Sequence, residues 1–231
     1  MQRIKCRVLD VRPFSDTVYH IRLAAPKGLH FNAGQYLKVV MSEEDKRPFS
    51  IASVAGEEVL ELHLGAFSPD SWAMQVVEHF QSQPEVELEM ADGNAHLRED
   101  SKRPLILIAG GTGFSYVRAI LRRALTLNPD RHIQVFWGGK TPEALYLHNE
   151  MKALDATHAN LKYIPVVEEL PADFDGQQGL VLDVVKAMNP DLSGFDIYIA
   201  GRFEMAAVAR DLFLAHGASS DNLFGDAFAF I

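Results

Sequence analysis

Residues 105–116 read LILIAGGTGFSY, an apolar run that breaks into three glycines within four residues. Apolar residues then recur at helical spacing, at Val117, Ile120 and Leu121. This pattern predicts a buried parallel strand that leads through a glycine-rich turn into the N-terminus of a helix. Free backbone N–H groups and the helix dipole at such a terminus favour an anion such as a phosphate or pyrophosphate.

Several interpretations of the glycine turn stay open on its sequence alone. The dinucleotide fingerprint G-x-G-x-x-G is met at Gly111 and Gly113 but has Tyr116 at its third glycine position. The nucleophile elbow G-x-S-x-G of hydrolases would make Ser115 the nucleophile, but Val117 replaces its final glycine. A tight strand–helix turn without any ligand is the simplest alternative. A Walker phosphate loop is excluded, because the turn is not followed by Gly-Lys-Ser/Thr.

Length, charge and cysteine content limit the classes to which the protein can belong. The 231 residues suffice for one large domain or for two of about 100–130 residues, each with a core. A net charge of −9, spread along the chain, argues against a nucleic-acid or membrane surface. The single cysteine, Cys6, excludes a disulfide framework and a four-thiolate metal or iron–sulfur site within the chain.

Targeting and metal binding are not predicted. The nine histidines are never three or four residues apart, which removes the usual helical pair of metal ligands, and no metal site is expected. Polar residues follow Met1, and no apolar run is long enough to cross a bilayer. A soluble, cytoplasmic protein without a signal peptide is therefore the expectation.

The first hundred residues are β-rich in pattern. Apolar and polar residues alternate around Ile4 and again around Ile21. Short strands with turn signals between them are typical of a sandwich or a small barrel. Further strand-like runs span residues 36–41, 49–52, 59–65 and 86–90, and one helix is expected near 71–80.

From residue 105 onward the pattern changes to alternating strands and helices. The charged segment 98–103, closed by Pro104, marks the connection. The alternation predicts a doubly wound parallel sheet. Its expected strands are 105–109, 133–137, 161–167 and 197–200, and its expected helices begin at 114, cover 143–156 and 182–188, and run through Leu214.

Two later strands end in a glycine followed by a cation, at Gly139-Lys140 and at Gly201-Arg202. Ligands of doubly wound sheets bind at the carboxyl ends of the strands, so these ends predict a glycine-lined crevice with positive charge nearby. Lys140 stands where an acidic residue would bind a ribose hydroxyl, and it would accept a 2′-phosphate. Ordinary surface charge is the alternative for Lys140.

A third motif lies in the β-rich half, at residues 47–53, RPFSIAS. Arg47 offers a planar fork for a phosphate or an electron-rich ring edge. Pro48 fixes the backbone, Phe49 supplies an aromatic face and Ser50 a small hydroxyl. An exposed turn that enters a strand is the alternative interpretation.

In order and spacing, these motifs resemble the ferredoxin–NADP reductase superfamily. Residues 46–50, 108–116, 197–205 and 224–231 are similar, more closely, to bacterial NAD(P)H:flavin reductases, including the luciferase-associated type. The resemblance runs essentially end to end. It implies an N-terminal antiparallel β-barrel flavin domain, residues 1–101, and a C-terminal doubly wound NAD(P)H-binding α/β domain, residues 102–231.

The resemblance also implies which residues form the sites, with Ser50 as the catalytic residue near flavin N5. The expected flavin-binding residues are Arg47, Pro48, Phe49, Ser50, Ile51, Ala52, Ser53, His63 and Gly65. The expected NAD(P)-binding residues are Gly110, Gly111, Thr112, Gly113, Phe114, Ser115, Tyr116, Gly201, Arg202, Phe203, Glu204 and Met205, to which the strand-end argument adds Gly139 and Lys140.

Three departures from the superfamily pattern refine the expected activity. Ala200 replaces a frequent cysteine, Ser115 replaces a frequent proline, and little sequence separates Gly65 from the helix at Ser71. They match the branch in which riboflavin, FMN or FAD is an exchangeable substrate rather than a fixed prosthetic group.

The resemblance implies direct hydride transfer from the nicotinamide of NADH or NADPH to flavin N5, with the reacting atoms about 3–3.5 Å apart. Reduced flavin would serve luciferase, oxygenases or ferric complexes, without nucleic-acid or membrane partners. One alternative is an electron-transfer subunit that keeps its flavin and serves a partner oxygenase or a ferric or cobalamin reduction system. A flavin or nucleotide sensor without turnover is the other.

Overall fold

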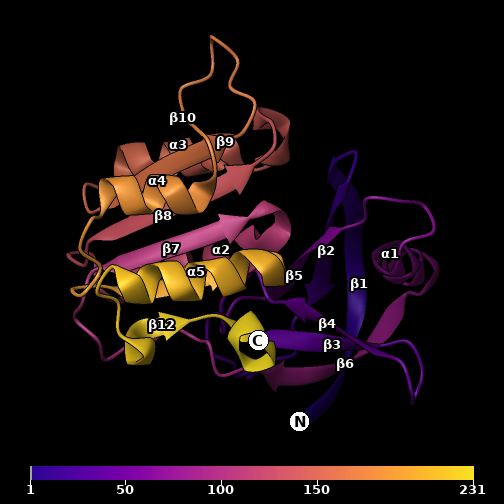
Figure 1. Ribbon diagram of the computed structural model, residues 1–231. Helices are drawn as coiled ribbons and strands as arrows, with labels where there is room; N and C mark the ends of the chain where they lie inside the picture. Colours follow the sequence, from indigo (N-terminus) through magenta and orange to yellow (C-terminus); the bar gives the residue numbers. More distant parts are fainter. Residues whose placement is uncertain (1) are drawn as a thin grey trace. The chain divides into compact units, whose positions relative to one another are not determined.

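The computed structural model describes residues 2–231, which form two compact units (Figure 1). The first unit runs through Leu97 and also includes Arg118–Arg123. The second unit comprises Arg98–Val117 and Ala124–Ile231. Each unit has a sheet of its own, and each is described separately.

The sheet of the first unit has six strands in the order β4-β3-β6-β1-β2-β5. All of its paired neighbours are antiparallel. Ile51, directly after β4, makes an antiparallel bridge with Leu62 of β5, so the two outer strands meet and the sheet closes. This confirms the expected antiparallel barrel. The strands are β1 Gln2–Ser15, β2 Val18–Ala24, β3 Tyr36–Val40, β4 Lys46–Ser50, β5 Val59–Gly65 and β6 Glu85–Asp92.

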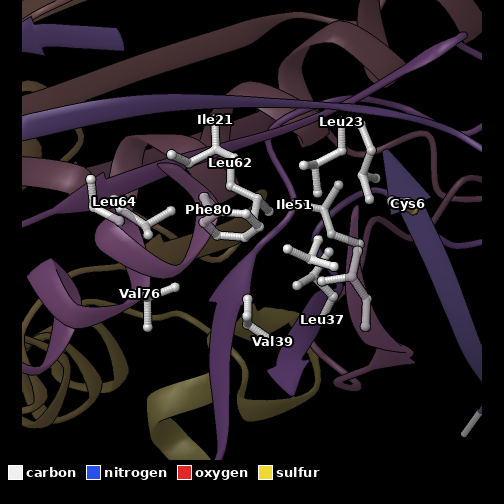
Figure 2. Packing of buried hydrophobic residues seen from close by; sticks show 14 of the residues in the cluster. Cys6, Ile21, Leu23, Leu37, Val39, Ile51, Leu62, Leu64, Val76 and Phe80 are labelled. Atoms are coloured by element: carbon white, nitrogen blue, oxygen red, sulfur yellow. The ribbon is translucent and has the colours of Figure 1, made fainter. Parts of the chain in front are cut away.

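One helix, α1 (Trp72–Ser82), packs on the core of this barrel. It begins where it does because the side chain of Ser71 accepts a hydrogen bond from the Met74 N–H at 3.1 Å, a typical N-cap. Its apolar face carries Val76 and Phe80 into the cluster shown in Figure 2. The thiol of Cys6 lies in the same cluster, where burial raises its pKa to about 11.

The sheet of the second unit has six strands in the order β10-β9-β8-β7-β11-β12. All of its paired neighbours are parallel. The chain adds strands to one side of β7 and then crosses to add β11 on the other side, which confirms the doubly wound sheet. The strands are β7 Leu105–Gly110, β8 Ile133–Gly139, β9 Leu161–Val167, β10 Gln177–Gln178, β11 Asp196–Ala200 and β12 Leu223–Phe224.

The helices of this part are α2 Phe114–Leu127, α3 His148–Thr157, α4 Val181–Met188 and α5 Phe203–Ala215. The helix expected at 143–156 begins later, because residues Pro142–Ala144 form a separate 3-10 turn that ends at Leu145. Three other 3-10 turns cover Gly111–Gly113, Ser220–Asn222 and Asp226–Phe230. Within residues 2–231, every helix is too short or too polar to cross a membrane.

Candidate functional site

The carboxyl ends of β7 and β11 lie side by side, and the flexible side chain of Met205 packs against the glycine at each end. A Cβ atom on Gly110 would lie 2.8 Å from the sulfur of Met205. A Cβ atom on Gly201 would lie 2.7 Å from the same sulfur and 3.6 Å from the Cα of Gly110. Two loops separated by ninety residues of sequence therefore form one cradle, at the point where the strand order of the sheet reverses.

Gly113 closes this cradle from the helix side. A Cβ atom there would overlap the backbone carbonyl of Ala200. Gly113 is also the N-cap of α2 and has no side chain to accept hydrogen bonds from the first turn, which contains no acidic residue. The Phe114 N–H already donates to the Gly111 and Thr112 carbonyls, so an anion here would be held by other backbone donors of this helix start. We call Gly110, Gly113, Gly201 and Met205 the glycine cradle.

The side chains after the glycines support the loop from inside. Phe114 stacks on Trp137 with ring centroids 3.7 Å apart, and the Trp137 indole N–H donates to the Gly111 carbonyl at 2.9 Å. The Ser115 hydroxyl is buried and donates to the Thr112 carbonyl at 3.0 Å. That arrangement does not present Ser115 as a nucleophile, so the hydrolase elbow finds no support.

Tyr116 is buried too, and burial holds the pKa of its phenol well above the usual range. Its side chain therefore belongs to the core of the second unit, and Tyr116 stays a prediction as a ligand contact. The structure thus explains why a tyrosine stands at the third glycine position of the fingerprint: this position packs inward.

The other predicted nucleotide-binding residues lie at the ends of β8 and β11. Gly139 packs against Ala144, and Lys140 is exposed and pairs with Glu169 at 3.2 Å. Arg202 is the N-cap of α5 and is exposed, as is Glu204. Phe203 is 56% exposed, and its ring meets Phe230 edge-on with centroids 6.0 Å apart.

In the first unit, the guanidinium of Arg47 makes its hydrogen bonds to neighbouring groups of the protein. Its guanidinium is buried and donates to Asp45 at 2.6 Å, to the Trp72 carbonyl at 2.7 Å and to the Gln75 side chain at 2.9 Å. The Trp72 ring lies 4.9 Å from the guanidinium carbon. Arg47 therefore fixes β4 to the start of α1, and its donors are used within the protein.

The pleat of β4 separates the neighbours of Arg47 onto two faces. Ser50 pairs with Tyr36 and Pro48 with Lys38 on β3, whereas Phe49 pairs with the fully buried Leu37. Pro48, Ser50 and Tyr36 therefore share the outer face of the barrel, which we call the Ser50 face. Tyr36 escaped the sequence analysis, because only the strand register brings it to Ser50.

Trp72 also escaped the sequence analysis. It is 48% exposed, and its ring lies 5.6 Å from that of Phe49 at an angle of 30°. An exposed tryptophan at a helix start is the one signal in the sequence that could have pointed to it. Phe49 and Trp72 together provide an aromatic edge beside β4.

The remaining predicted flavin-binding residues support the barrel wall. Ile51 and Ala52 are fully buried, and the buried Ser53 hydroxyl accepts from the Glu61 N–H at 3.0 Å. His63 is buried, and burial together with the charge of Arg118 holds the pKa of its imidazole well below the usual range. These residues stay predictions as ligand contacts.

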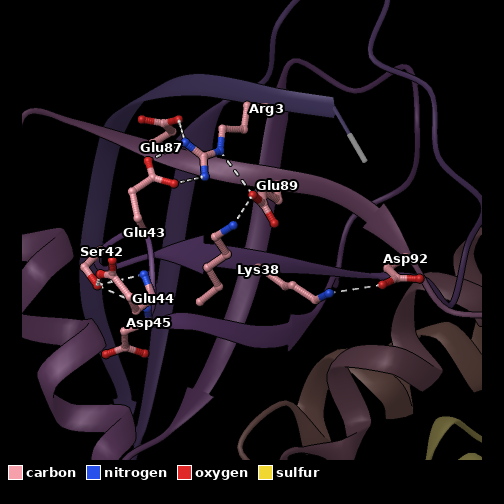
Figure 3. A network of polar contacts seen from close by, with 10 residues as sticks. Arg3, Lys38, Ser42, Glu43, Glu44, Asp45, Glu87, Glu89 and Asp92 are labelled. Carbon is pink, nitrogen blue, oxygen red and sulfur yellow. Dashed lines mark hydrogen bonds and ion pairs between the residues drawn. The ribbon is translucent and has the colours of Figure 1, made fainter.

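Ion pairs join side chains of β1, β3 and β6, as Figure 3 shows. Lys38 pairs with Asp92 at 3.2 Å, and Lys46 pairs with Glu89 at 2.8 Å. Arg3 joins the same group through Glu89 at 3.1 Å. The cations next to β4 are thus each matched by a carboxylate.

Comparison with known proteins places this chain in a family. Residues 107–211 match the family model described as the oxidoreductase NAD-binding domain. The chain is 45% identical to an NAD(P)H-flavin reductase of Vibrio harveyi, over 99% of this chain and 99% of that protein. The chain belongs to the NAD(P)H-flavin reductase family.

Solved structures similar to this flavin reductase family member confirm its two-part fold. The crystal structure of Amycolatopsis cytochrome P450 reductase GcoB matches with a TM-score of 0.88 at 24% identity, over 97% of this chain and 69% of that one. A ferredoxin NADP+ reductase from Neisseria gonorrhoeae with bound FAD and NADP matches with a TM-score of 0.81 at 16% identity, over 97% and 98% of the two chains.

The residues present fit the ligands that the family name implies. A dinucleotide needs a close backbone approach and a helix N-terminus for its pyrophosphate, and the glycine cradle offers both. A planar flavin ring needs an aromatic or flat surface with a hydrogen-bonding group, and the Ser50 face combines Tyr36, Pro48 and a hydroxyl.

Proposed function

We propose that this protein transfers a hydride from NADH or NADPH to a flavin that binds and leaves as a substrate. The observation that carries the proposal is the glycine cradle, in which a Cβ atom on Gly113 would meet the Ala200 backbone and one on Gly110 or Gly201 would meet the end of the Met205 side chain. One NAD(P)H, one oxidised flavin and one proton give one NAD(P)+ and one reduced flavin. The hydride passes from nicotinamide C4 to flavin N5.

The chain's own residues bind and orient rather than react. The cradle and the first turn of α2 hold the pyrophosphate through backbone N–H groups and the helix dipole. On the Ser50 face, the hydroxyl of Ser50 donates a hydrogen bond close to flavin N5, and Tyr36 lies against the ring. Because hydride transfer needs no protein base, orientation is the main contribution of these side chains.

We propose further that the first unit recognises the isoalloxazine ring and not the phosphate tail. Arg47, Lys38 and Lys46 already pair with carboxylates, so they do not supply a phosphate site. The segment between β5 and α1 covers only residues 66–71. Riboflavin, FMN and FAD would therefore all be accepted, and each would leave after reduction.

The released reduced flavin would then serve other acceptors. Luciferase, oxygenases and ferric complexes all take electrons from reduced flavin, and they are the partners we propose. A bound flavin that serves one partner oxygenase, or a ferric or cobalamin reduction system, is the rival arrangement. The two differ in whether flavin stays on the protein.

Absorption spectra and NADH oxidation of the purified protein test the proposal. We expect a colourless protein that oxidises NADH only after riboflavin, FMN or FAD is added. A yellow protein with one flavin per chain would support the rival arrangement. NADH oxidation that stays at the background rate with every added flavin would refute flavin reduction altogether.

Ser50→Ala tests the role of the hydroxyl. We expect hydride transfer to riboflavin, followed by stopped-flow absorption, to slow about tenfold, since one hydrogen bond of about 1–1.5 kcal/mol is lost in the transition state. Ser82→Ala is the matched control, because that exposed hydroxyl only donates to the His79 carbonyl at the end of α1. Equal rates in both variants would remove Ser50 from the site.

A further inference from the structure

The register of two barrel strands places two histidines beside each other in the first unit. His20 of β2 pairs directly with His63 of β5, and Glu61 lies two residues before His63 on the same face of β5. One ligand atom from each of the three residues lies within 4.8 Å of the other two. The histidines are only 5% and 4% exposed, so this cluster lies inside the barrel wall.

His20 is the least satisfied member of this cluster. Among residues 2–231, neither of its ring nitrogens has a hydrogen-bond partner, although both are buried. The nearest carboxylate oxygen, Oε2 of Glu61, lies 3.8 Å from its Nε2. A buried imidazole without hydrogen bonds costs free energy, and such groups in native proteins require an explanation such as a bound water or ion.

We propose that His20, Glu61 and His63 bind one divalent transition-metal ion of the zinc type. Two imidazole nitrogens and a carboxylate oxygen form a ligand set that suits Zn²⁺ or Co²⁺, with a fourth position left for water. Ca²⁺ and Mg²⁺ are not expected, because they require several oxygen ligands. The proposed metal site shares His63 with the predicted flavin-binding residues, but its test does not depend on flavin reduction.

Arg118, on the part of α2 that belongs to the first unit, completes the surroundings of the cluster. It donates to Oε2 of Glu61 at 2.7 Å and to the Ala52 carbonyl at 3.0 Å, which fixes the carboxylate in place as outer partners of metal ligands do. Its positive charge also opposes a dication. Binding should therefore be weaker than at a closed cysteine-rich zinc site.

Metal binding requires the ligand atoms to close up. At zinc–ligand distances of about 2.0–2.1 Å, tetrahedral donors lie about 3.3 Å apart, which is less than the largest separation in the cluster. Phe14 stacks on one face of the His20 ring, at 4.4 Å between centroids, and guides it as it moves. The expected movement is a small rotation of His20 toward Glu61.

Cobalt titration of untagged, chelator-treated protein tests the site. We expect one equivalent of Co²⁺ to give visible ligand-field absorption, and one equivalent of Zn²⁺ to remove it. His20→Gln should weaken Co²⁺ binding about 100-fold, at least as much as the loss of an outer-shell partner does. His132→Gln is the matched control, because His132 is exposed and lies in the second unit. It should bind Co²⁺ as the unaltered protein does.

A second measurement keeps the proposal testable if His20→Gln fails to fold, as judged by circular dichroism. Proton NMR of the unaltered protein with Co²⁺ should show hyperfine-shifted imidazole N–H signals from two histidines. Absence of saturable Co²⁺ absorption would overturn the proposal. So would unchanged affinity in folded His20→Gln, or the absence of shifted histidine signals.

Discussion

The glycine cradle and the Ser50 face use opposite means to build a binding surface. The cradle is built on glycine backbone with the Met205 side chain against it, and Gly113 is the residue at which a side chain would meet backbone. The Ser50 face consists of side chains, and the pleat of β4 determines which of them are presented. Gly110 and Gly113 of the first motif lie in the cradle, whereas a Cβ atom on Gly111 would meet open space, and the second motif is divided between surface and interior.

The two sites are therefore expected to tolerate different substitutions. In the cradle, one added methyl group displaces backbone, because a Cβ atom at Gly113 would meet the Ala200 carbonyl. On β4, Arg47 and Ser50 lie three residues apart, yet one holds the fold together and the other faces outward. We therefore expect substitutions in the cradle to weaken nucleotide binding. Along β4, we expect substitution of Arg47 to lower stability and substitution of Ser50 to affect flavin binding.

The largest effect is expected for Gly113→Ala. The backbone of the turn must move away from Ala200, and displacement of about 1 Å in an oriented site costs about 100-fold in rate. We expect kcat/KM for NADH to fall by about that factor, measured at saturating riboflavin. Gly194→Ala is the matched control, because nothing lies within 4 Å of a Cβ atom there. A Gly113→Ala variant with unchanged kcat/KM would show that the cradle does not bind the nucleotide.

Arg47→Lys is expected to lower the stability of the first unit by about 2 kcal/mol. Lysine cannot reproduce the fork that joins Asp45, the Trp72 carbonyl and Gln75, so at least one of these acceptors loses its partner. Urea unfolding followed by circular dichroism measures the change, with Arg12→Lys on the exposed part of β1 as control. An unchanged unfolding midpoint with a raised KM for flavin would instead make Arg47 a ligand contact.

Sequence patterns predicted the elements well but not their relations across the sheet. The strands at 59–65 and 161–167 and the start of the helix at Phe114 are where the periodicity placed them. The two-residue strands β10 and β12 carry no periodicity of their own, since only their neighbours in the sheet define them. The late start of α3 depends on a local turn at Pro142.

Tyr36 and His20 escaped the sequence analysis for the same reason. Tyr36 reaches Ser50, and His20 reaches His63, through strand registers that join residues far apart in the chain. A shift of one residue in such a register would move a side chain to the opposite face, and no local pattern reports the register. The glycine cradle was predictable because each glycine acts through its own backbone.

Tyr36→Ala tests whether the Ser50 face holds the flavin ring. Loss of an aromatic contact of about 0.5–1.5 kcal/mol should raise the KM for riboflavin about fivefold. The KM for NADH should stay unchanged, because the cradle belongs to the other unit. Tyr19→Ala, on β2, is a tyrosine control outside this face. Equal riboflavin KM values for both variants would contradict the assignment of the face.

The smallest effect concerns the response of the two units to alkaline pH. Burial raises the pKa of Cys6 in the first unit from 9.0 to about 11, and that of Tyr198 in the second from 10.0 to about 12. A thiol that ionises more easily when unfolded stabilises the fold below pH 9, and this contribution disappears as the pH rises toward 11. Cys6 alone should thus cost the first unit about 1 kcal/mol by pH 10. Each of the buried tyrosines Tyr116, Tyr163 and Tyr198 should cost the second unit about 0.4 kcal/mol, because an unfolded phenol is half ionised at that pH.

Cys6→Val should remove this loss, because valine fills the same apolar site without a titrating group. Urea unfolding at pH 8 and pH 10 measures this loss of stability. A Trp72→Phe background leaves Trp137 as the single tryptophan, so its fluorescence follows the unfolding of the second unit. A thiol reagent should react with Cys6 in the unaltered protein only as fast as the first unit opens. Rapid reaction at pH 8 would mean that the barrel core opens more readily than its packing indicates. In that case bound flavin would have to stabilise the strands that carry the Ser50 face.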